Sequence, residues 1–331
     1  MEQELDIPAK PKFRARVKTV LRQHEAEISL GDSHCSFEFQ DGERRAVERL
    51  FDQLEAGGLT LVDLASLSPE IAEQLPRLLR DFDRLRLLVD SEPLDVGGAS
   101  SGAQLYREVR RLADRVAARV AKSAFYEALQ SGRATQRQLI GYALEYHWIV
   151  QAAPGLIGPA LATAHSATER MMLQDFLRSE LGHDRFLATA LAAVGLTPGD
   201  LELHQPLPAT FALGASLGVY ARQHPLSFKA CLFLFERAQP SFIAAFDAHC
   251  RILGLPEEFY LPLRRHAELN DDYDHEDISR ELLQLESAVD RESCIAVKRH
   301  VALLVETMIQ QEETILSYYG RPDSPLPRIF A

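Results

Sequence analysis

Long apolar runs, a secretion signal and paired cysteines are all missing from this 331-residue chain. No window of 18 residues is both uncharged and apolar, so we expect no membrane-spanning helix. Residues 1–6 are acidic and polar, and they lack the basic start and apolar stretch of a secretion signal. The four cysteines are scattered and none belongs to a CxxC pair, which disfavours zinc-ribbon, iron–sulfur and thioredoxin-type sites. We therefore predict a cytoplasmic protein whose thiols stay reduced.

Basic residues are also in short supply. Lys and Arg number 36 against 48 Asp and Glu, and the formal net charge is −12. A surface this acidic repels phosphate groups, so we expect no general affinity for nucleic acid or for an anionic membrane. The chain also lacks a P-loop, a dinucleotide-binding fingerprint and a nucleophile elbow, which disfavours the enzymes built on them. Small molecules and peptides remain as partners.

The composition is otherwise that of a globular protein, and the chain divides into two parts. Apolar residues make up 46% and charged residues 25% of the chain, which is ordinary usage for folded domains. The length predicts two domains. Residues 96–103 lie in a Gly- and Ser-rich stretch that is typical of a linker. We therefore expect one domain over residues 1–95 and a second over residues 104–331.

The first part has the element order of a winged helix. Alternating apolar positions predict strands over residues 16–21, 26–30 and 34–39. Three helices and a short closing strand over residues 87–89 follow. Residues 1–95 hold 13 basic and 20 acidic residues, so they lack the positive surface that DNA binding needs.

Three features of residues 1–95 resemble a known kind of domain. They are the strands, the stretch that ends in Leu64 and Ala65, and the helix before Leu87. They resemble the small winged-helix domain that binds leader peptides in enzymes that modify ribosomally made peptides. The resemblance implies a precursor or leader peptide as the partner of residues 1–95. The alternative is a packing domain that binds no ligand.

The second part is predicted to be almost entirely helical. Apolar residues recur at helical spacing throughout residues 104–331. The expected helices cover residues 104–130, 135–150, 154–164, 167–195, 209–222, 225–253, 256–285 and 290–319. Helices of these lengths form a single α-helical bundle. The predicted fold class is therefore mainly α, with a small α+β domain in front of the bundle.

Ionisable residues interrupt the apolar stripes of three of these helices. Glu180 and His183 share a face with large apolar residues, and Glu236 is the one carboxylate between residues 225 and 246. A later helix adds, at steps of four and three, Glu268, Asp272 and His275. Burying a carboxylate is unfavourable by several kcal/mol unless it meets a cation or a metal. Carboxylate and imidazole ligands on bundle helices suit iron or manganese.

The segments around these residues resemble the heme-oxygenase-like di-iron oxidase and oxygenase superfamily. Its fold is shared with thiaminase-II-like proteins and with pyrroloquinoline-quinone synthase, and the resemblance covers most of residues 104–331. The metal ligands that it implies are Glu145, Glu180, His183, Glu236, Glu268, Asp272 and His275. Members often carry a His where this chain has Glu268, and His266 lies two residues earlier. The choice between Glu268 and His266 therefore stays open.

The resemblance implies an enzyme that holds two iron ions, with manganese as an alternative, and that uses O2. Glu180 and Glu236 are its expected catalytic residues. The substrate would be peptide-borne or amino-acid-like and would be oxidised in a biosynthetic pathway, and a homodimer is one assembly that the family allows. Two other functions stay open: a metal-free oxidase of the same fold, and a non-enzymatic winged-helix adaptor or sensor with a helical ligand-binding domain.

Overall fold

The computed structural model divides into two compact units, residues 1–104 and residues 105–331, and each is described by itself. The described residues are 7–14, 16–30, 33–85, 87–91, 100–119, 123–236, 240–272 and 278–330. Half of the predicted linker, residues 96–99, lies outside them. In the part of the chain that is described, no helix is both long enough and apolar enough to cross a membrane.

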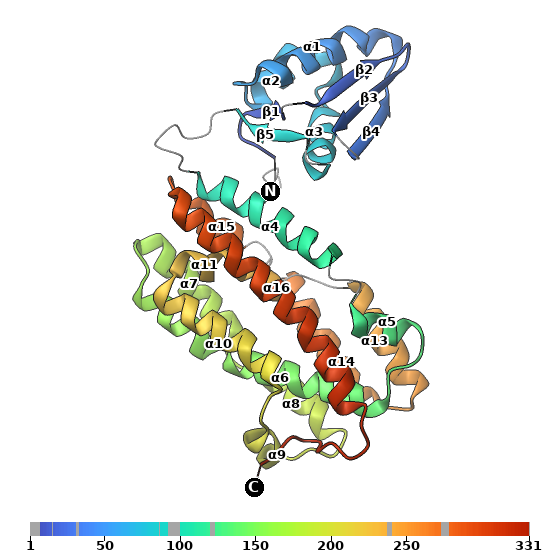
Figure 1. Cartoon of the computed structure of the whole chain (residues 1–331), viewed down its shortest axis with the longest axis vertical. Helices are drawn as coiled ribbons and strands as arrows, with labels where there is room; N and C mark the ends of the chain where they lie inside the picture. The colour runs from blue at the N-terminus through green and yellow to red at the C-terminus, as the bar shows by residue number, and fades with distance from the viewer. Residues whose placement is uncertain are drawn as a thin grey trace. The chain divides into compact units, whose positions relative to one another are not determined.

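The strands of the first unit form two small antiparallel sheets (Figure 1). A three-stranded sheet has the order β2 (Lys18–Leu21), β3 (Glu25–Leu30), β4 (Ser33–Glu38). A second sheet pairs β1 (Pro11–Phe13) with β5 (Leu88–Asp90). Alternation along β3 buries Ala26 and Ile28, as period-two patterning requires. The three predicted strands of the larger sheet are present, whereas β1 was not predicted because three residues carry no readable alternation.

Three α-helices cover the apolar side of these sheets in the described part of the first unit. They are α1 (Arg44–Ala56), α2 (Leu61–Leu67) and α3 (Leu75–Arg84). Thr60 begins α2 through a capping box with Asp63, which satisfies backbone groups at the helix start. Apolar residues of the helices and strands form one core, which includes Leu50, Phe82 and Ile28. The first unit is therefore a small α+β domain, as predicted.

The second unit is a helical bundle. Its described helices are α4 (Gly102–Arg119), α5 (Ala124–Gln130), α6 (Gln136–Ala162), α7 (Ala167–Glu180), α8 (Asp184–Ala192), α9 (Pro198–Leu203), α10 (Pro208–Gln223), α11 (Pro225–Cys231), α12 (Phe233–Glu236), α13 (Pro240–Ile252), α14 (Glu257–Asp272), α15 (Ile278–Gln284) and α16 (Arg291–Tyr319). The long helix α6 packs against α7, α8 and α10, and α8 also packs against α14 (Figure 1). Helix α6 contributes residues to both apolar core clusters of the bundle, so its polar residues enter the interior.

Several helix boundaries differ from the prediction. Helix α6 is continuous where two helices were expected, because Pro154 lies inside the helix instead of beginning a new one. A proline in a helix removes one backbone hydrogen bond, and tertiary packing can compensate for that loss. The helix predicted over residues 167–195 is broken after Glu180, where Gly182 adopts φ +89°. Glycine reaches this left-handed region without steric strain.

Candidate functional site

A buried pocket lies among the helices of the second unit. Its volume for water-sized molecules is about 70 Å³, and one water needs roughly 10–15 Å³ on that measure, so it holds a small chemical group. Most of its wall is apolar and comes from α6, α7, α10, α11 and α12. Four polar side chains also line it: Tyr146, Glu180, Glu236 and His266. An apolar pocket with a few convergent polar groups is the usual form of a small-molecule site.

Glu180 and His183 meet at the break between α7 and α8. Helix α7 ends at Glu180, and His183 is the residue just before α8. His183 Nδ1 lies 3.5 Å from Glu180 Oε2, and both residues are buried. The Glu180 carboxylate raises the pKa of His183 above its ordinary value, with smaller contributions from Glu236 and Asp184. The turn at Gly182 therefore keeps the predicted pair together although the helix does not continue through it.

Tyr146 and His266 form a second polar pair at the pocket. The Tyr146 hydroxyl and His266 Nδ1 are 2.9 Å apart and form a hydrogen bond. The centre of the His266 ring lies 5.0 Å from that of the His183 ring. Burial raises the pKa of Tyr146 well above its ordinary value, and the charges of Glu236 and Glu180 add to this effect. The two pairs and Glu236 therefore form one group, which we call the pocket cluster: Tyr146, Glu180, His183, Glu236 and His266.

The sequence pattern indicates that His266 is buried, whereas the prediction named this residue only as an alternative to Glu268. Phe259, Leu263 and His266 follow one another at steps of four and three, and all three are buried. His266 is therefore on the buried stripe of α14. Tyr146 was expected only as core or pocket wall, and its hydrogen bond to His266 could not be read from spacing because the two residues are 120 positions apart.

Three predicted ligands follow His266 along the chain. Glu268 and Asp272 belong to the helical backbone of α14, but their side chains are not among the described ones. His275 lies outside the described residues altogether. Their roles as ligands stay predictions. Among the His, Cys, Asp and Glu residues that are described, no group of three or more is arranged to hold a metal ion.

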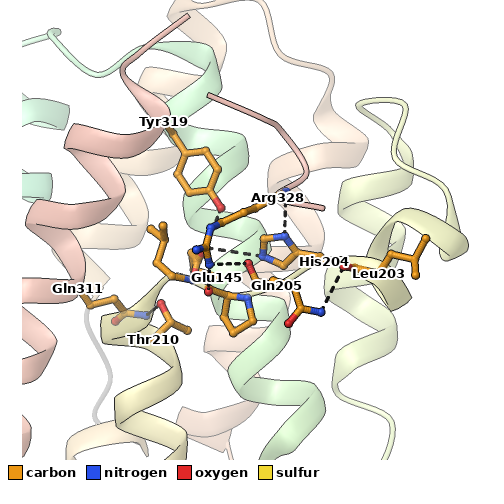
Figure 2. Close-up of polar contacts among 10 residues, drawn as sticks. Glu145, Leu203, His204, Gln205, Thr210, Gln311, Tyr319 and Arg328 are labelled. Carbon is orange, nitrogen blue, oxygen red and sulfur yellow. Dashed lines mark hydrogen bonds and ion pairs between the residues drawn. The ribbon is translucent and has the colours of Figure 1, made fainter. Parts of the chain in front are cut away.

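Glu145 takes part in a different group of contacts (Figure 2). Its Oε1 accepts a hydrogen bond from the Tyr319 hydroxyl at 2.6 Å, and its Oε2 accepts one from the Leu207 backbone N–H at 2.9 Å. His204 Nε2 lies 3.6 Å from Oε1. Glu145 is fully buried and does not line the pocket. The structure therefore does not bring this predicted ligand together with the pocket cluster.

The contacts of Glu145 join three parts of the bundle. Residues 204–207 precede α10, and Arg328 lies in the segment after α16. The Arg328 backbone N–H donates to His204 Nδ1 at 3.2 Å, and Gln205 N–H donates to the Arg328 carbonyl at 2.8 Å (Figure 2). Gly141, one turn before Glu145, has no room for a side chain because the Tyr319 ring packs on it. Glu145 therefore holds α10 and α16 to α6, which is a structural role.

The donor atoms of the pocket cluster are of the chemical type that iron or manganese prefers, although the described residues do not place three of them around one point. They are carboxylate oxygens and imidazole nitrogens, which these metals prefer over thiolates. His183 Nδ1 is buried and makes no hydrogen bond within the described part of the chain. A buried polar atom of this kind calls for an ion, a water or a ligand. Without a metal, the same groups can bind a polar substrate group and exchange protons with it.

Solved structures with a similar fold belong to small helical proteins. A domain of unknown function with a heme oxygenase-like fold from Shewanella denitrificans OS217 aligns with a TM-score of 0.56 at 16% identity, over 69% of this chain and 97% of its own. A TenA homolog from Pseudomonas syringae pv. tomato aligns with a TM-score of 0.55 at 16% identity, over 65% of this chain and 93% of its own. No family model and no curated protein matches the sequence. The second unit therefore has the heme-oxygenase-like fold, which confirms the predicted fold class.

Proposed function

We propose that this protein is a non-heme di-iron enzyme that uses O2 to oxidise an organic substrate in a biosynthetic pathway. The observation that carries the proposal is the pocket cluster: Glu180, Glu236 and His266 line a mostly apolar pocket, and His183 lies directly behind Glu180 and beside His266. The buried His183 Nδ1 makes no hydrogen bond with the described residues, and a metal ion is one partner that satisfies such an atom. The substrate class is peptide-borne or amino-acid-like.

The residues that would hold the metal come from three helices and the turn after α7. Glu180, His183, Glu236 and His266 belong to the described structure. Asp272 and His275 would complete the set as proposed ligands that follow His266 in the sequence. Bound iron would supply the capacity to activate O2, which no protein side chain has by itself.

The other residues of the pocket have roles that follow from their contacts. The hydrogen bond from Tyr146 fixes the rotation of the His266 ring, as contacts behind metal-binding histidines commonly do. The raised pKa of Tyr146 keeps its hydroxyl protonated at every ordinary pH. Apolar side chains such as Phe228 and Leu232 exclude water from the pocket, which protects reactive species from side reactions.

For the first unit we propose peptide recognition. Its acidic surplus makes it a poor partner for DNA and a better one for a basic peptide. Such a peptide would be the leader of a precursor whose other end enters the pocket. A pull-down with basic peptides and with a DNA duplex tests this: retention of the duplex and not of the peptides would contradict the proposal.

Metal titration of the purified protein tests the di-iron proposal. Anaerobic addition of Fe(II) followed by metal analysis should give two iron ions per chain, and exposure to O2 should change the absorption spectrum. The Glu236→Gln variant should lose bound iron, whereas Glu258→Gln, a change of an exposed residue on α14, should not. Wild-type protein that binds no iron, or a Glu236→Gln variant that binds as much as wild type, would contradict it.

A metal-free oxidase of the same fold is a second candidate. The Tyr146–His266 hydrogen bond supports it, because a buried phenol and an imidazole can exchange protons with a substrate directly. O2 consumption by chelator-treated protein, once a substrate is known, would favour this candidate over the di-iron enzyme. A non-enzymatic adaptor would consume no O2 with any metal or reductant.

A further inference from the structure

A second depression lies on the surface beside His183. We call it the vestibule, and it is formed by the end of α7, the turn after it and the start of α8, with a volume of about 750 Å³. Its lining includes Leu181, Gly182, His183, Arg185 and Phe186. Leu181 is 61% exposed there. The vestibule is thus a wide, accessible site, unlike the buried pocket.

Side chains of the pocket cluster join the vestibule to the pocket. Glu180 lines the pocket and His183 lines the vestibule, and the two side chains approach within 3.5 Å of each other. The His183 ring also lies 5.0 Å, centre to centre, from the ring of His266, which lines the pocket. The wall between the two spaces is therefore about one side chain thick at this point. A molecule in the vestibule contacts a member of the pocket cluster directly.

Two arginines form no ion pair with a carboxylate among the described residues: Arg185 lines the vestibule, and Arg265 lies beside it, against Phe186. Arg185 lines the vestibule, and its side chain lies back over Gly182, 3.9 Å from where a Cβ would stand. Arg265 is next to His266 on α14, and its guanidinium lies 5.8 Å from the centre of the Phe186 ring. Neither arginine forms an ion pair within the part of the chain that is described.

Neighbouring arginines are neutralised, which makes these two distinctive. Arg178, also at the vestibule, forms an ion pair with Asp175 at 2.6 Å. Arg264, next to Arg265, forms one with Asp247 at 3.2 Å. The acid of the turn, Asp184, is not part of the vestibule lining. The described residues that line the vestibule therefore carry a net positive charge, in a protein whose overall charge is strongly negative.

We propose that the substrate is an amphipathic anion whose charged head binds Arg185 in the vestibule and Arg265 beside it, and whose apolar body extends past His183 so that its end enters the pocket. The head is a carboxylate or a phosphate ester, because guanidinium groups bind both through paired hydrogen bonds. The body is apolar because the pocket wall beyond the cluster is formed by residues such as Leu217, Phe228 and Leu232. The inference rests on the proposed function in taking the pocket as the place of reaction, and it narrows the substrate to a free anion, such as an amino-acid-like carboxylate with an apolar side chain, in place of a peptide-borne group.

Binding to the metal-free, full-length protein tests the inference without any catalytic activity. Calorimetry at low salt would compare four probes with one chain length: octanoate, octyl phosphate, octylamine and octan-1-ol. We expect an anionic probe to bind about tenfold more tightly than octan-1-ol, and we expect the difference to shrink as salt is added. Whichever of octanoate and octyl phosphate binds more tightly identifies the head group.

Matched variants test whether the two arginines cause the preference for anionic probes. The double variant Arg185→Gln/Arg265→Gln should reduce binding of the anionic probe to the level of octan-1-ol. The control Arg170→Gln/Arg299→Gln removes the same charge at two other exposed positions of this unit and should leave the difference intact. Leu232→Trp, which fills the pocket, should weaken all four probes together.

Three results would overturn the inference. They are equal affinity for anion and alcohol, an anion preference that survives the double variant, and tightest binding of octylamine. Absence of binding by every probe would also overturn it. Because the protein is metal-free, a failed iron titration leaves these results unaffected, so the two proposals fail separately.

Discussion

Two groups of buried acidic and histidine residues lie in the same bundle, and they are compensated in opposite ways. Around Glu145, protein donors satisfy both carboxylate oxygens, and the contacts join α6, α10 and α16 (Figure 2). In the pocket cluster, Glu180 and Glu236 line a pocket, and His183 Nδ1 lacks a hydrogen bond within the described residues. The contacts of the first group stabilise the fold, whereas the second group has the features of a ligand-binding site.

This difference limits what a buried carboxylate in a sequence can predict about function. An acidic residue on an apolar stripe shows that some compensation exists, since the burial is otherwise unfavourable. The identity of the compensating partner depends on which segments the fold brings to that residue. Glu145 and Glu180 look alike in sequence because each lies among apolar neighbours on a helix.

Removing the Glu145 side chain should have the largest effect on stability. In Glu145→Ala, the Tyr319 hydroxyl and the Leu207 N–H lose a charged acceptor in a buried place, and we expect a loss of about 3 kcal/mol in the free energy of unfolding. Equilibrium unfolding in urea, followed by circular dichroism, measures it. A loss of unfolding free energy below about 1 kcal/mol would show that the contacts of Glu145 do not stabilise the bundle as proposed.

The two hydrogen-bonded tyrosines should respond differently to loss of the hydroxyl. Tyr319→Phe removes a hydrogen bond to a carboxylate, so we expect about 2 kcal/mol of destabilisation. Tyr146→Phe removes a hydrogen bond to an imidazole in place of a carboxylate, so we expect about 1 kcal/mol or less. The same urea experiment compares them. Equal losses, or a larger loss for Tyr146→Phe, would remove the contrast between the two groups.

Changes in the pocket cluster should affect binding far more than stability. Glu180→Gln keeps the shape of the side chain and removes its charge, so we expect a change in stability within about 1 kcal/mol together with loss of iron binding. Thermal unfolding with and without Fe(II) measures both, because a bound ligand raises the unfolding temperature. An iron-dependent rise of the same size in Glu180→Gln and wild type would argue against a role of Glu180 in holding metal.

The smallest expected effect concerns His147, whose pKa responds to Asp184, the residue after His183, and to His204, which lies beside Glu145. Burial lowers the pKa of His147; the charge of Asp184 opposes this shift and that of His204 adds to it. Between the lowered folded pKa and the ordinary value of 6.5, the unfolded chain binds more protons, so stability should rise with pH through this window and level off above it. His147→Gln should flatten that slope in urea unfolding from pH 5 to pH 7.5. An unchanged slope would mean that other titratable groups cause the pH dependence of stability.

The fold class and most helices could be predicted because they depend on local patterns. The spacing of apolar residues located α10 and α16 to within a few residues of the observed bounds. Prediction was wrong where the chain departs from local rules. Pro154 does not begin a new helix because packing on both sides of α6 holds the helix together, and Gly182 breaks a periodic stretch that has no other signal.

The candidate site was predictable in part. Glu180, His183 and Glu236 stood out because ionisable residues are rare on apolar stripes, and the structure gathers all three. Glu145 was expected as a ligand only from the family resemblance, and its partners are supplied by segments 62 and 174 residues away in the sequence. No local pattern encodes such distant contacts.

Composition and periodicity alone determined that this chain is acidic, mainly helical and divided into two parts, because charge and apolar spacing are properties of each segment by itself. They also indicated that Glu180 and Glu236 would be buried, but they gave no sign of the buried Glu169 and Asp247. Only the tertiary structure decided the consequence of each burial: Tyr319 satisfies Glu145, whereas His183 and a pocket lie beside Glu180. The physical reason is that a buried charge is compensated through space, by whichever groups the packing of distant helices brings within a few ångströms of it.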